Sequence, residues 1–311
     1  MRVAIVDLGT NTFNLLISEI NDKGFTVIHK EKQAVKLGKS GINSGVIAED
    51  AFKRGLNAMT YYAEEIKKYN CDQTLAIATS AMRDSKNAPE FIKEVLAETG
   101  ITIEVISGQR EAEFIQKGVA LSLPNELTDY VIMDVGGGST EFIIVKNSEV
   151  IWSRSYNLGV SRLLDWLAPS GPISETDIAR LTDRLDSELE ELYSTIATLN
   201  ITTLIGSSGS FDSLHDMIAT PKNGIALSAD LEFSALALDE VSAIHHRLLA
   251  STLPERLAMK GLVTMRADMM VISSLEIQTV LNKCKIQKLF RSSFALKEGL
   301  LEDLRTSKIL E

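Results

Sequence analysis

The sequence predicts an α/β fold built from two similar halves, and three observations support this prediction. A short pattern occurs twice: residues 5–12 read IVDLGTNT and residues 132–141 read IMDVGGGSTE, and each is followed by an apolar run. Each copy is typical of a buried strand that ends in an aspartate, a tight turn, and a second strand. Strand-like and helix-like segments alternate through both halves, as they do in α/β domains. The chain has 311 residues, of which 45% are hydrophobic, enough to fill the core of one large or two medium domains.

The first half continues from its opening hairpin with alternating strands and helices. The helix expected at 49–69 carries Phe52, Leu56, Met59, Ala63 and Ile66 on one stripe, which predicts a buried face. The expected elements are a strand at 25–35, this helix, a strand at 74–78, a helix at 89–98, a strand at 102–106 and a helix at 109–121.

A helix-breaking segment at 123–126, which contains Pro124, separates the halves. We therefore expect domains at 1–123 and 124–311, with the last helix a candidate to pack back on the first domain. In the second half, Ser174 and Asp177 form a capping box that predicts the start of a long helix. The other expected elements are strands at 130–134, 140–146, 150–156, 202–205 and 286–290, and helices at 161–167, 238–249, 262–281 and 294–304.

Composition excludes several classes of protein. The two cysteines, Cys71 and Cys284, show no C-x-x-C spacing, which argues against a disulfide framework or a zinc site and favours a reducing compartment. We see no signal peptide and no apolar stretch of membrane length, so we expect a cytoplasmic protein with no membrane partner. The net charge of -10 argues against general binding of nucleic acid. Lysines at 30, 32, 36 and 39 are either a local basic lining for an anionic substrate or ordinary surface residues.

The two turns predict phosphate binding. Glycine allows the backbone to approach an anion, and turn N–H groups and hydroxyls can donate to phosphate oxygens. Aspartates cannot bind phosphate directly, so Asp7 and Asp134 would rather hold a metal ion or its waters. Turns of this composition also occur for conformational reasons alone. The candidate phosphate-binding residues are Gly9, Thr10, Asn11, Thr12, Gly136, Gly137, Gly138, Ser139 and Thr140.

Three further segments could carry chemistry. Arg83 follows an expected parallel strand and could bind phosphate through its fork of donors, or it could be a surface residue paired with Asp84. Glu111 lies at the start of a helix and could take a proton from water. Alternatively, its negative charge could simply interact favourably with the helix dipole. A glycine turn at a helix start can hold phosphate or approach a base. The residues of that turn are Gly206, Ser207, Gly209 and Ser210. The four histidines show no metal-binding spacing.

Taken together, these segments resemble the exopolyphosphatase and guanosine-pentaphosphate phosphohydrolase family, within the actin-like, sugar-kinase-like and Hsp70-like ATPase superfamily. The matching segments follow the family order along nearly the whole chain: 7–12, 78–83, 107–112, 134–141, 158–163, 206–210, 266–268 and 297–299. The resemblance implies an α/β fold of two ribonuclease-H-like lobes with the active site in a central cleft. It implies that Glu111 activates water and that Arg83 and the two turns hold phosphate. It also implies that Asp134 and Glu141, with Asp7, bind Mg²⁺ or another divalent cation.

The sequence departs from the family pattern in three places. Family members often have two adjacent glutamates where this chain has Arg110 and Glu111, although Glu111 keeps its position before Ala112. Lys297 replaces the usual arginine of the last motif. Many members continue into a helical C-terminal region, whereas this chain stops at Glu311, so we expect the grip on long chains supplied by that region to be missing.

These observations lead to a functional hypothesis with alternatives. The first choice is an exopolyphosphatase, which releases orthophosphate from the end of inorganic polyphosphate. The second is hydrolysis of guanosine pentaphosphate. The same fold also hosts small-molecule kinases, which are a third alternative. Because Arg110 stands where family members often have a glutamate, a non-catalytic sensor of phosphate or of a nucleotide alarmone is a fourth. A homodimer is common in the family, but no interface signature is visible in the sequence.

Overall fold

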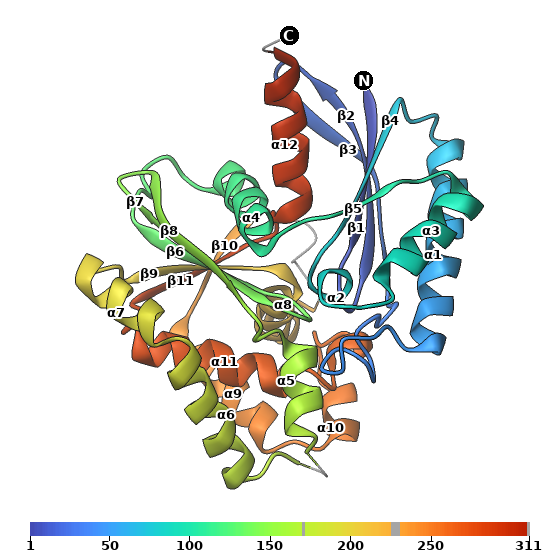
Figure 1. The fold of residues 1–311 in the computed structure, drawn as a ribbon. Helices are drawn as coiled ribbons and strands as arrows, with labels where there is room; N and C mark the ends of the chain where they lie inside the picture. Colours follow the sequence, from blue (N-terminus) through green and yellow to red (C-terminus); the bar gives the residue numbers. More distant parts are fainter. Residues whose placement is uncertain (170–171, 225–230, 310–311) are drawn as a thin grey trace. The chain divides into compact units, whose positions relative to one another are not determined.

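The computed structural model describes residues 1–169, 172–224 and 231–309 (Figure 1). The chain forms two compact units, one made of Met1–Gly118 with Leu296–Glu311 and the other of Val119–Ala295. Each unit contains one mixed β-sheet covered by helices, as predicted for an α/β protein. Within the described residues, no helix is both long enough and apolar enough to cross a membrane.

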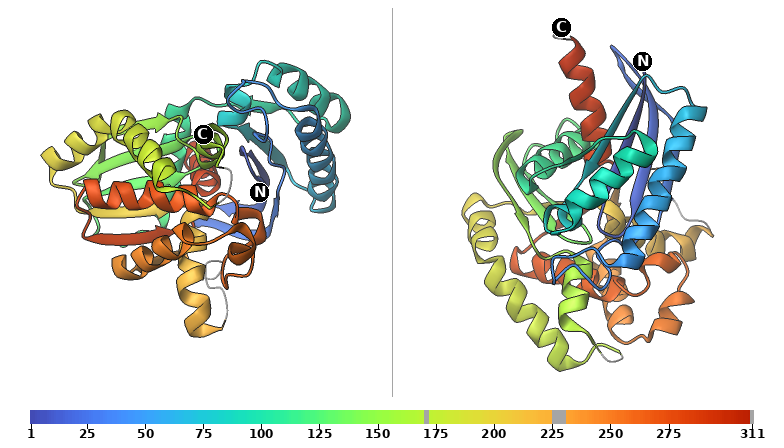
Figure 2. Two further views of the ribbon diagram at one scale, coloured as in Figure 1. Left: turned by 90° about the horizontal axis from the view of Figure 1, so that it is seen from below. Right: turned by 45° about the vertical axis from the view of Figure 1, so that its right-hand side comes forward.

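The first unit is built on a five-stranded sheet of order β3-β2-β1-β4-β5. Strands β1 and β2 are antiparallel, whereas β1, β4 and β5 run parallel. Helices α1 and α3 cover one face of this sheet and α12 lies against the other (Figures 1 and 2). The elements are β1 (Arg2–Leu8), β2 (Phe13–Asn21), β3 (Gly24–Gln33), α1 (Glu49–Lys68), β4 (Gln73–Ala78), α2 (Ser80–Arg83), α3 (Ala88–Thr99), β5 (Ile103–Val105), α4 (Gly108–Ser122) and α12 (Leu296–Ile309).

The second unit is built on a six-stranded sheet of order β10-β11-β9-β6-β7-β8. One large apolar core joins this sheet to its helices. The strands are β6 (Tyr130–Val135), β7 (Thr140–Lys146), β8 (Glu149–Tyr156), β9 (Thr203–Ser207), β10 (Phe233–Leu236) and β11 (Lys288–Ser292). The helices are α5 (Val160–Leu167), α6 (Glu175–Glu188), α7 (Glu190–Leu199), α8 (Ser208–Asn223), α9 (Leu238–Leu249), α10 (Leu253–Leu257), the 3₁₀ turn η1 (Thr264–Arg266) and α11 (Met270–Lys283).

The two sheets share one topology. The order β3-β2-β1-β4-β5 corresponds to β8-β7-β6-β9-β11, with antiparallel and parallel pairs in the same places and β10 added at the edge. The two hairpins also match in register, because Asp7 lies opposite Asn14 and Asp134 opposite Glu141. The duplication predicted from the sequence is therefore confirmed at the level of strand order.

Several element predictions were wrong in detail. The helix expected at 262–281 begins only at Met270, after η1, and because it is buried on all sides no amphipathic stripe marks its start. The long helix after the capping box ends at Glu188, and α7 follows after Leu189. The capping box itself is confirmed, with Ser174 and Asp177 bonded reciprocally. The short elements α2, β10 and α10 were missed because their apolar patterns are too brief to recognise.

Candidate functional site

The turn of the first hairpin is held from its carbonyl side by a neighbouring loop. Gly9 N–H donates to Thr12 O at 3.1 Å and closes the turn. The N–H groups of Gly38 and Lys36 donate to Thr10 O at 3.1 Å and to Asn11 O at 2.8 Å. In a trans peptide the N–H points opposite to the C=O. The N–H groups of Asn11 and Thr12 therefore point away from the 36–38 loop, which suits a bound anion.

The turn of the second hairpin is held in the same way by the start of α5. Val160 N–H donates to Gly136 O at 3.0 Å, Ser161 N–H to Gly137 O at 2.8 Å, and Arg162 Nε to Gly138 O at 3.0 Å. The same peptide geometry directs the N–H groups of Gly137, Gly138 and Ser139 to the opposite side. Consecutive N–H groups on one side of a turn form an anion-binding concavity.

Gly159 allows this close approach of α5. A Cβ atom at Gly159 would lie 2.4 Å from both Gly138 C and Ser139 N. Because real Cβ atoms do not approach backbone so closely, a larger residue would push α5 off the turn. The segment at 158–163 therefore supports the second turn, which is a role that its sequence alone did not disclose.

A carboxylate pair lies directly behind the second turn. Asp134 and Glu141 face each other across β6 and β7, and both are buried. The Asp134 carboxylate accepts hydrogen bonds from Ser207 Oγ and, at 2.7 and 2.8 Å, from Ser208 Oγ. Glu141 Oε1 accepts a bond of 2.6 Å from Ser155 Oγ. Hydroxyl donors thus orient both carboxylates.

The corresponding pair in the first unit contains one carboxylate. Asp7 lies opposite Asn14, and Asn14 Nδ2 donates to Asp7 Oδ2 at 2.9 Å. Asn14 occupies the position that Glu141 has in the second hairpin. The first hairpin therefore carries less negative charge than the second.

The geometry of the second unit fits a magnesium ion. Mg²⁺ commonly binds through one or two carboxylates, keeps several waters and takes further oxygens from substrate phosphates. Asp134 and Glu141 supply two oriented carboxylates on one side of a hairpin. Within residues 1–169, 172–224 and 231–309, no group of three or more His, Cys, Asp or Glu side chains forms a closed metal cage. Asp134 and Glu141 would hold the ion together with water.

Arg83 and Glu111 form an ion pair in the first unit. Arg83 follows β4 in the short helix α2, and Glu111 lies in the first turn of α4 after the adjacent parallel strand β5. Arg83 Nη1 donates to Glu111 Oε2 and to Ile106 O, both at 3.1 Å. Their side chains are 23% and 10% exposed. Arg83 is thus paired with Glu111, and the alternative pairing with Asp84 was wrong.

Arg110 turns away from this pair and joins α4 to α12. Its guanidinium lies 3.0 Å from Glu113 Oε2 and 3.4 Å from Asp303 Oδ2, and it stacks over the Phe114 ring at 4.2 Å. Lys117 forms a further ion pair with Asp303. The departure from the family pattern at this position therefore serves helix packing.

The turn at 206–210 lies beside the carboxylate pair of the second unit. Ser207 and Ser208 both bind Asp134, and Ser208 adopts a left-handed backbone with φ of 66°. The Arg266 guanidinium packs directly on Gly209. A Cβ atom at Gly209 would lie only 1.5 Å from Arg266 Nη2. Burial lowers the pKa of Arg266, and the charges of Asp212 and Asp134 oppose this shift.

A further acid, Glu276 of α11, lies beside the same hairpin. Its side chain is fully buried. Burial raises the pKa of Glu276 to about 8, the Thr140 hydroxyl opposes the shift, and the charge of Glu141 adds to it. Glu276 is therefore protonated at neutral pH.

Sequence reasoning singled out both turns and, separately, Arg83 and Glu111, but it missed three polar residues around them and gave Ser208 and Arg266 no role of their own. Asn14 could have been found from its place in the repeat, where it corresponds to Glu141. Ser155 and Glu276 come from a distant strand and helix, and no local motif marks them, whereas Ser208 and Arg266 lie in the segments 206–210 and 266–268 that resemble the family. The missed residues are Asn14, Ser155 and Glu276.

Two α/β units with sheets of the same topology, each with a hairpin whose turn directs N–H groups to one side, define a duplicated α/β protein with two candidate phosphate-binding turns. The comparisons with known proteins are more specific. A family model described as the Ppx/GppA phosphatase family matches residues 16–308, and the chain belongs to this family.

Individual relatives agree with this membership. The crystal structure of an exopolyphosphatase from Cytophaga hutchinsonii is 36% identical, with a TM-score of 0.94 over 99% of this chain and 98% of that one. Exopolyphosphatase 2 of Mycobacterium tuberculosis is 30% identical over 276 residues, which is 86% of each protein. The guanosine-5'-triphosphate,3'-diphosphate pyrophosphatase of Aeromonas salmonicida is 24% identical over 97% of this chain and 59% of that protein.

Proposed function

We propose that this protein is an exopolyphosphatase, which hydrolyses the terminal phosphoanhydride bond of inorganic polyphosphate and releases orthophosphate. The observation that carries the proposal is the shared support of the two turns. In each unit, neighbouring N–H groups hold the turn carbonyls, so that the turn N–H groups point to the opposite side. The exopolyphosphatases of C. hutchinsonii and M. tuberculosis support the choice of substrate.

The proposed mechanism uses positioning and charge stabilisation, which phosphoryl transfer mainly requires. The turn of each unit is suited to donate N–H and hydroxyl groups to phosphate oxygens of the substrate. Arg83 binds the phosphoryl group that is transferred, and Glu111 orients and deprotonates the attacking water. The ion pair between Arg83 and Glu111 supports this assignment because it holds the acid next to an anion-binding group.

Magnesium is the proposed cofactor. Asp134 and Glu141 of the second unit would hold it, and the ion would neutralise negative charge on the phosphate oxygens. Arg266 and the turn at 206–210 would complete the surroundings of Asp134, since Ser207 and Ser208 bind its carboxylate.

Guanosine pentaphosphate is the second candidate substrate. The A. salmonicida relative is named for hydrolysis of this nucleotide, and its match covers almost the whole of the present chain. The net charge of -10 also disfavours a long basic track for polyphosphate. Phosphate release from short polyphosphate, long polyphosphate and guanosine pentaphosphate, measured in parallel, tests the proposal. Faster release from guanosine pentaphosphate would reverse the order of the candidates, and no release from any of the three would contradict both.

An assay of ATP-dependent acceptor phosphorylation and a measurement of polyphosphate binding separate the remaining alternatives. A small-molecule kinase would transfer phosphate from ATP to an acceptor, and a non-catalytic sensor would bind polyphosphate in the presence of Mg²⁺ without turnover. The proposal also includes a cytoplasmic location, which suits the two free cysteines, and a homodimeric assembly, which light scattering would test.

A further inference from the structure

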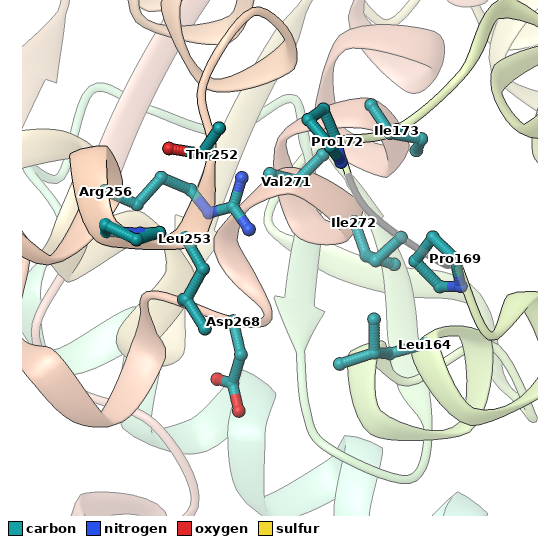
Figure 3. A pocket seen from close by; sticks show the side chains of 11 residues that line it. Leu164, Pro169, Pro172, Ile173, Thr252, Leu253, Arg256, Asp268, Val271 and Ile272 are labelled. Atoms are coloured by element: carbon teal, nitrogen blue, oxygen red, sulfur yellow. The ribbon is translucent and has the colours of Figure 1, made fainter.

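A pocket of about 420 Å³ lies in the second unit, between the end of α5, the start of α11 and the short helix α10 (Figure 3). Among the described residues, none of those assigned above to phosphate or metal binding lines it. Its walls are mainly aliphatic, with Leu164, Ile173, Leu253, Val271 and Ile272 among the lining residues. The volume falls within the range of pockets that hold small organic molecules.

One buried cation stands against these apolar walls. Arg256 is only 8% exposed, and its guanidinium is directed into the pocket (Figure 3). Arg256 Nε donates to Ala267 O at 2.8 Å and Nη1 donates to Ser251 O at 2.6 Å. Both acceptors are neutral carbonyls, so these bonds fix the guanidinium without neutralising its charge. Nη2 and the second N–H of Nη1 are the donors that remain for a ligand.

The backbone around Arg256 is also well fixed. The capping box of Thr252 and Glu255 starts α10, and Pro254 lies in its first turn. Burial lowers the pKa of Arg256, while the charges of Asp268 and Glu255 oppose the shift, and a guanidinium stays charged in proteins. Asp268 also lines the pocket, and its carboxylate points away from the guanidinium in Figure 3.

These features restrict the chemistry of an occupant. The charges of Asp268 and Glu255 act on the guanidinium, but its hydrogen-bond acceptors are neutral carbonyls, so an anionic head gains an attraction that a purely apolar molecule lacks. A metal ion would be repelled by the guanidinium. A fully hydrated anion would leave the aliphatic walls without a partner, whereas an anion with an apolar body satisfies both parts of the pocket.

We propose that this pocket binds a small amphipathic anion, whose carboxylate or phosphate-monoester head contacts Arg256 and whose apolar body packs against Leu253, Val271 and Ile272. Guanidinium groups recognise both head groups through paired N–H donors. The site is distinct from the proposed phosphoanhydride site and does not depend on that function.

The test is direct binding to the full-length protein by calorimetry, with octanoate, hexyl phosphate and the neutral analogue 1-octanol as probes. We expect octanoate or hexyl phosphate to bind at least about tenfold more tightly than 1-octanol. Tighter binding of octanoate would identify a carboxylate head, and tighter binding of hexyl phosphate a phosphate monoester. Equal binding of 1-octanol, or no binding of either anion at millimolar concentration, would overturn the proposal.

A matched pair of variants on α10 locates the binding. Leu253 lines the pocket and is 43% exposed, whereas Leu257 is 46% exposed and does not line it. Because both residues are partly exposed, glutamate at either position should leave the fold intact. We expect Leu253→Glu to weaken anion binding at least tenfold through charge repulsion and Leu257→Glu to change it less than about twofold. Unchanged binding to Leu253→Glu would place the anion elsewhere and refute the site.

Discussion

Arg83 and Glu111 meet through a single contact of 3.1 Å between Nη1 and Oε2, although 28 residues separate them in the sequence. The parallel strands β4 and β5 bring them together, because one residue follows each strand at the same edge of the sheet. The guanidinium also donates to Ile106 O, which limits its freedom. In the proposed mechanism Arg83 would bind the phosphoryl group, and Glu111, held beside it, would act on the attacking water.

The first prediction concerns Glu111→Gln. Glutamine keeps the shape of the side chain but cannot accept a proton, so we expect kcat to fall at least about a hundredfold while KM changes little. Phosphate release from polyphosphate measures both constants. Glu113→Gln is the matched control, since Glu113 lies on the same helix and pairs with Arg110. A variant at Glu111 with normal turnover would remove this residue from the mechanism.

A second prediction concerns Arg83→Lys, which keeps the positive charge but loses the planar fork. Lysine cannot bond to Glu111, Ile106 O and substrate at the same time, so we expect kcat/KM to fall at least about tenfold. Arg110→Lys provides the comparison, because Arg110 contacts Glu113 and Asp303 instead. Equal losses in the two variants would show that Arg83 has no particular part in catalysis.

The third prediction concerns the metal. If Asp134 holds Mg²⁺, then Asp134→Asn should raise the Mg²⁺ concentration needed for half-maximal activity by about tenfold or more, because an amide is a poorer ligand than a carboxylate. EDTA should abolish activity and added Mg²⁺ should restore it. Titration of activity with Mg²⁺ measures the effect, and Asp183→Asn on the exposed face of α6 is the control. Full activity in EDTA would contradict a metal-dependent reaction.

The parts of the site that the sequence predicted are those encoded locally. An aspartate, a glycine turn and flanking apolar runs lie within about ten residues in each hairpin, so strand, turn and candidate ligands could be recognised together. Glu111 could be placed because a helix start after a strand has a recognisable pattern. The capping box at Ser174 was equally local and is confirmed.

The remaining parts depend on strand register and on helix packing between distant segments. Ser155 reaches Glu141 because β8 pairs with β7 in one particular register, and Arg266 reaches Gly209 because η1 packs against the start of α8. Glu276 lies in a helix buried on all sides, where an acid has no periodic signal. Such contacts are set by the tertiary structure, so single-sequence patterns do not reveal them.

A fourth prediction explains the glycine of the last family motif. A Cβ atom at Gly299 would lie 1.8 Å from Phe114 O, so α12 can pack on α4 only with glycine there. Alanine normally favours a helix over glycine by about 1 kcal/mol, but the clash should reverse the sign. We expect Gly299→Ala to lower the free energy of unfolding by about 1 to 3 kcal/mol. Urea unfolding measures this, with Ser307→Ala on exposed α12 as control; a stabilised variant would contradict the packing argument.

The last prediction follows from the raised pKa of Glu276, which burial moves from 4.5 to about 8. Between these values the folded protein keeps a proton that the unfolded chain releases. The folded state therefore binds more protons in this window, and stability falls as pH rises. Each pH unit in the window changes the contribution by up to about 1.4 kcal/mol. Below pH 4.5 and above about pH 8 the contribution no longer changes.

Glu276→Gln should remove this dependence, because glutamine has a similar shape and does not ionise. We expect the variant to gain stability relative to the wild type on going from about pH 5 to pH 9, by an amount on the order of a few kcal/mol. Urea unfolding of both proteins at each pH gives the difference, in which the titrations of all other groups cancel. Glu255→Gln is the control, since the pKa of Glu255 is lowered by hydrogen bonds to Thr252 and should produce the opposite trend at acid pH. A difference between wild type and Glu276→Gln that stays constant with pH would mean that Glu276 is already ionised in the folded protein, and that a positive group or a bound cation compensates its charge.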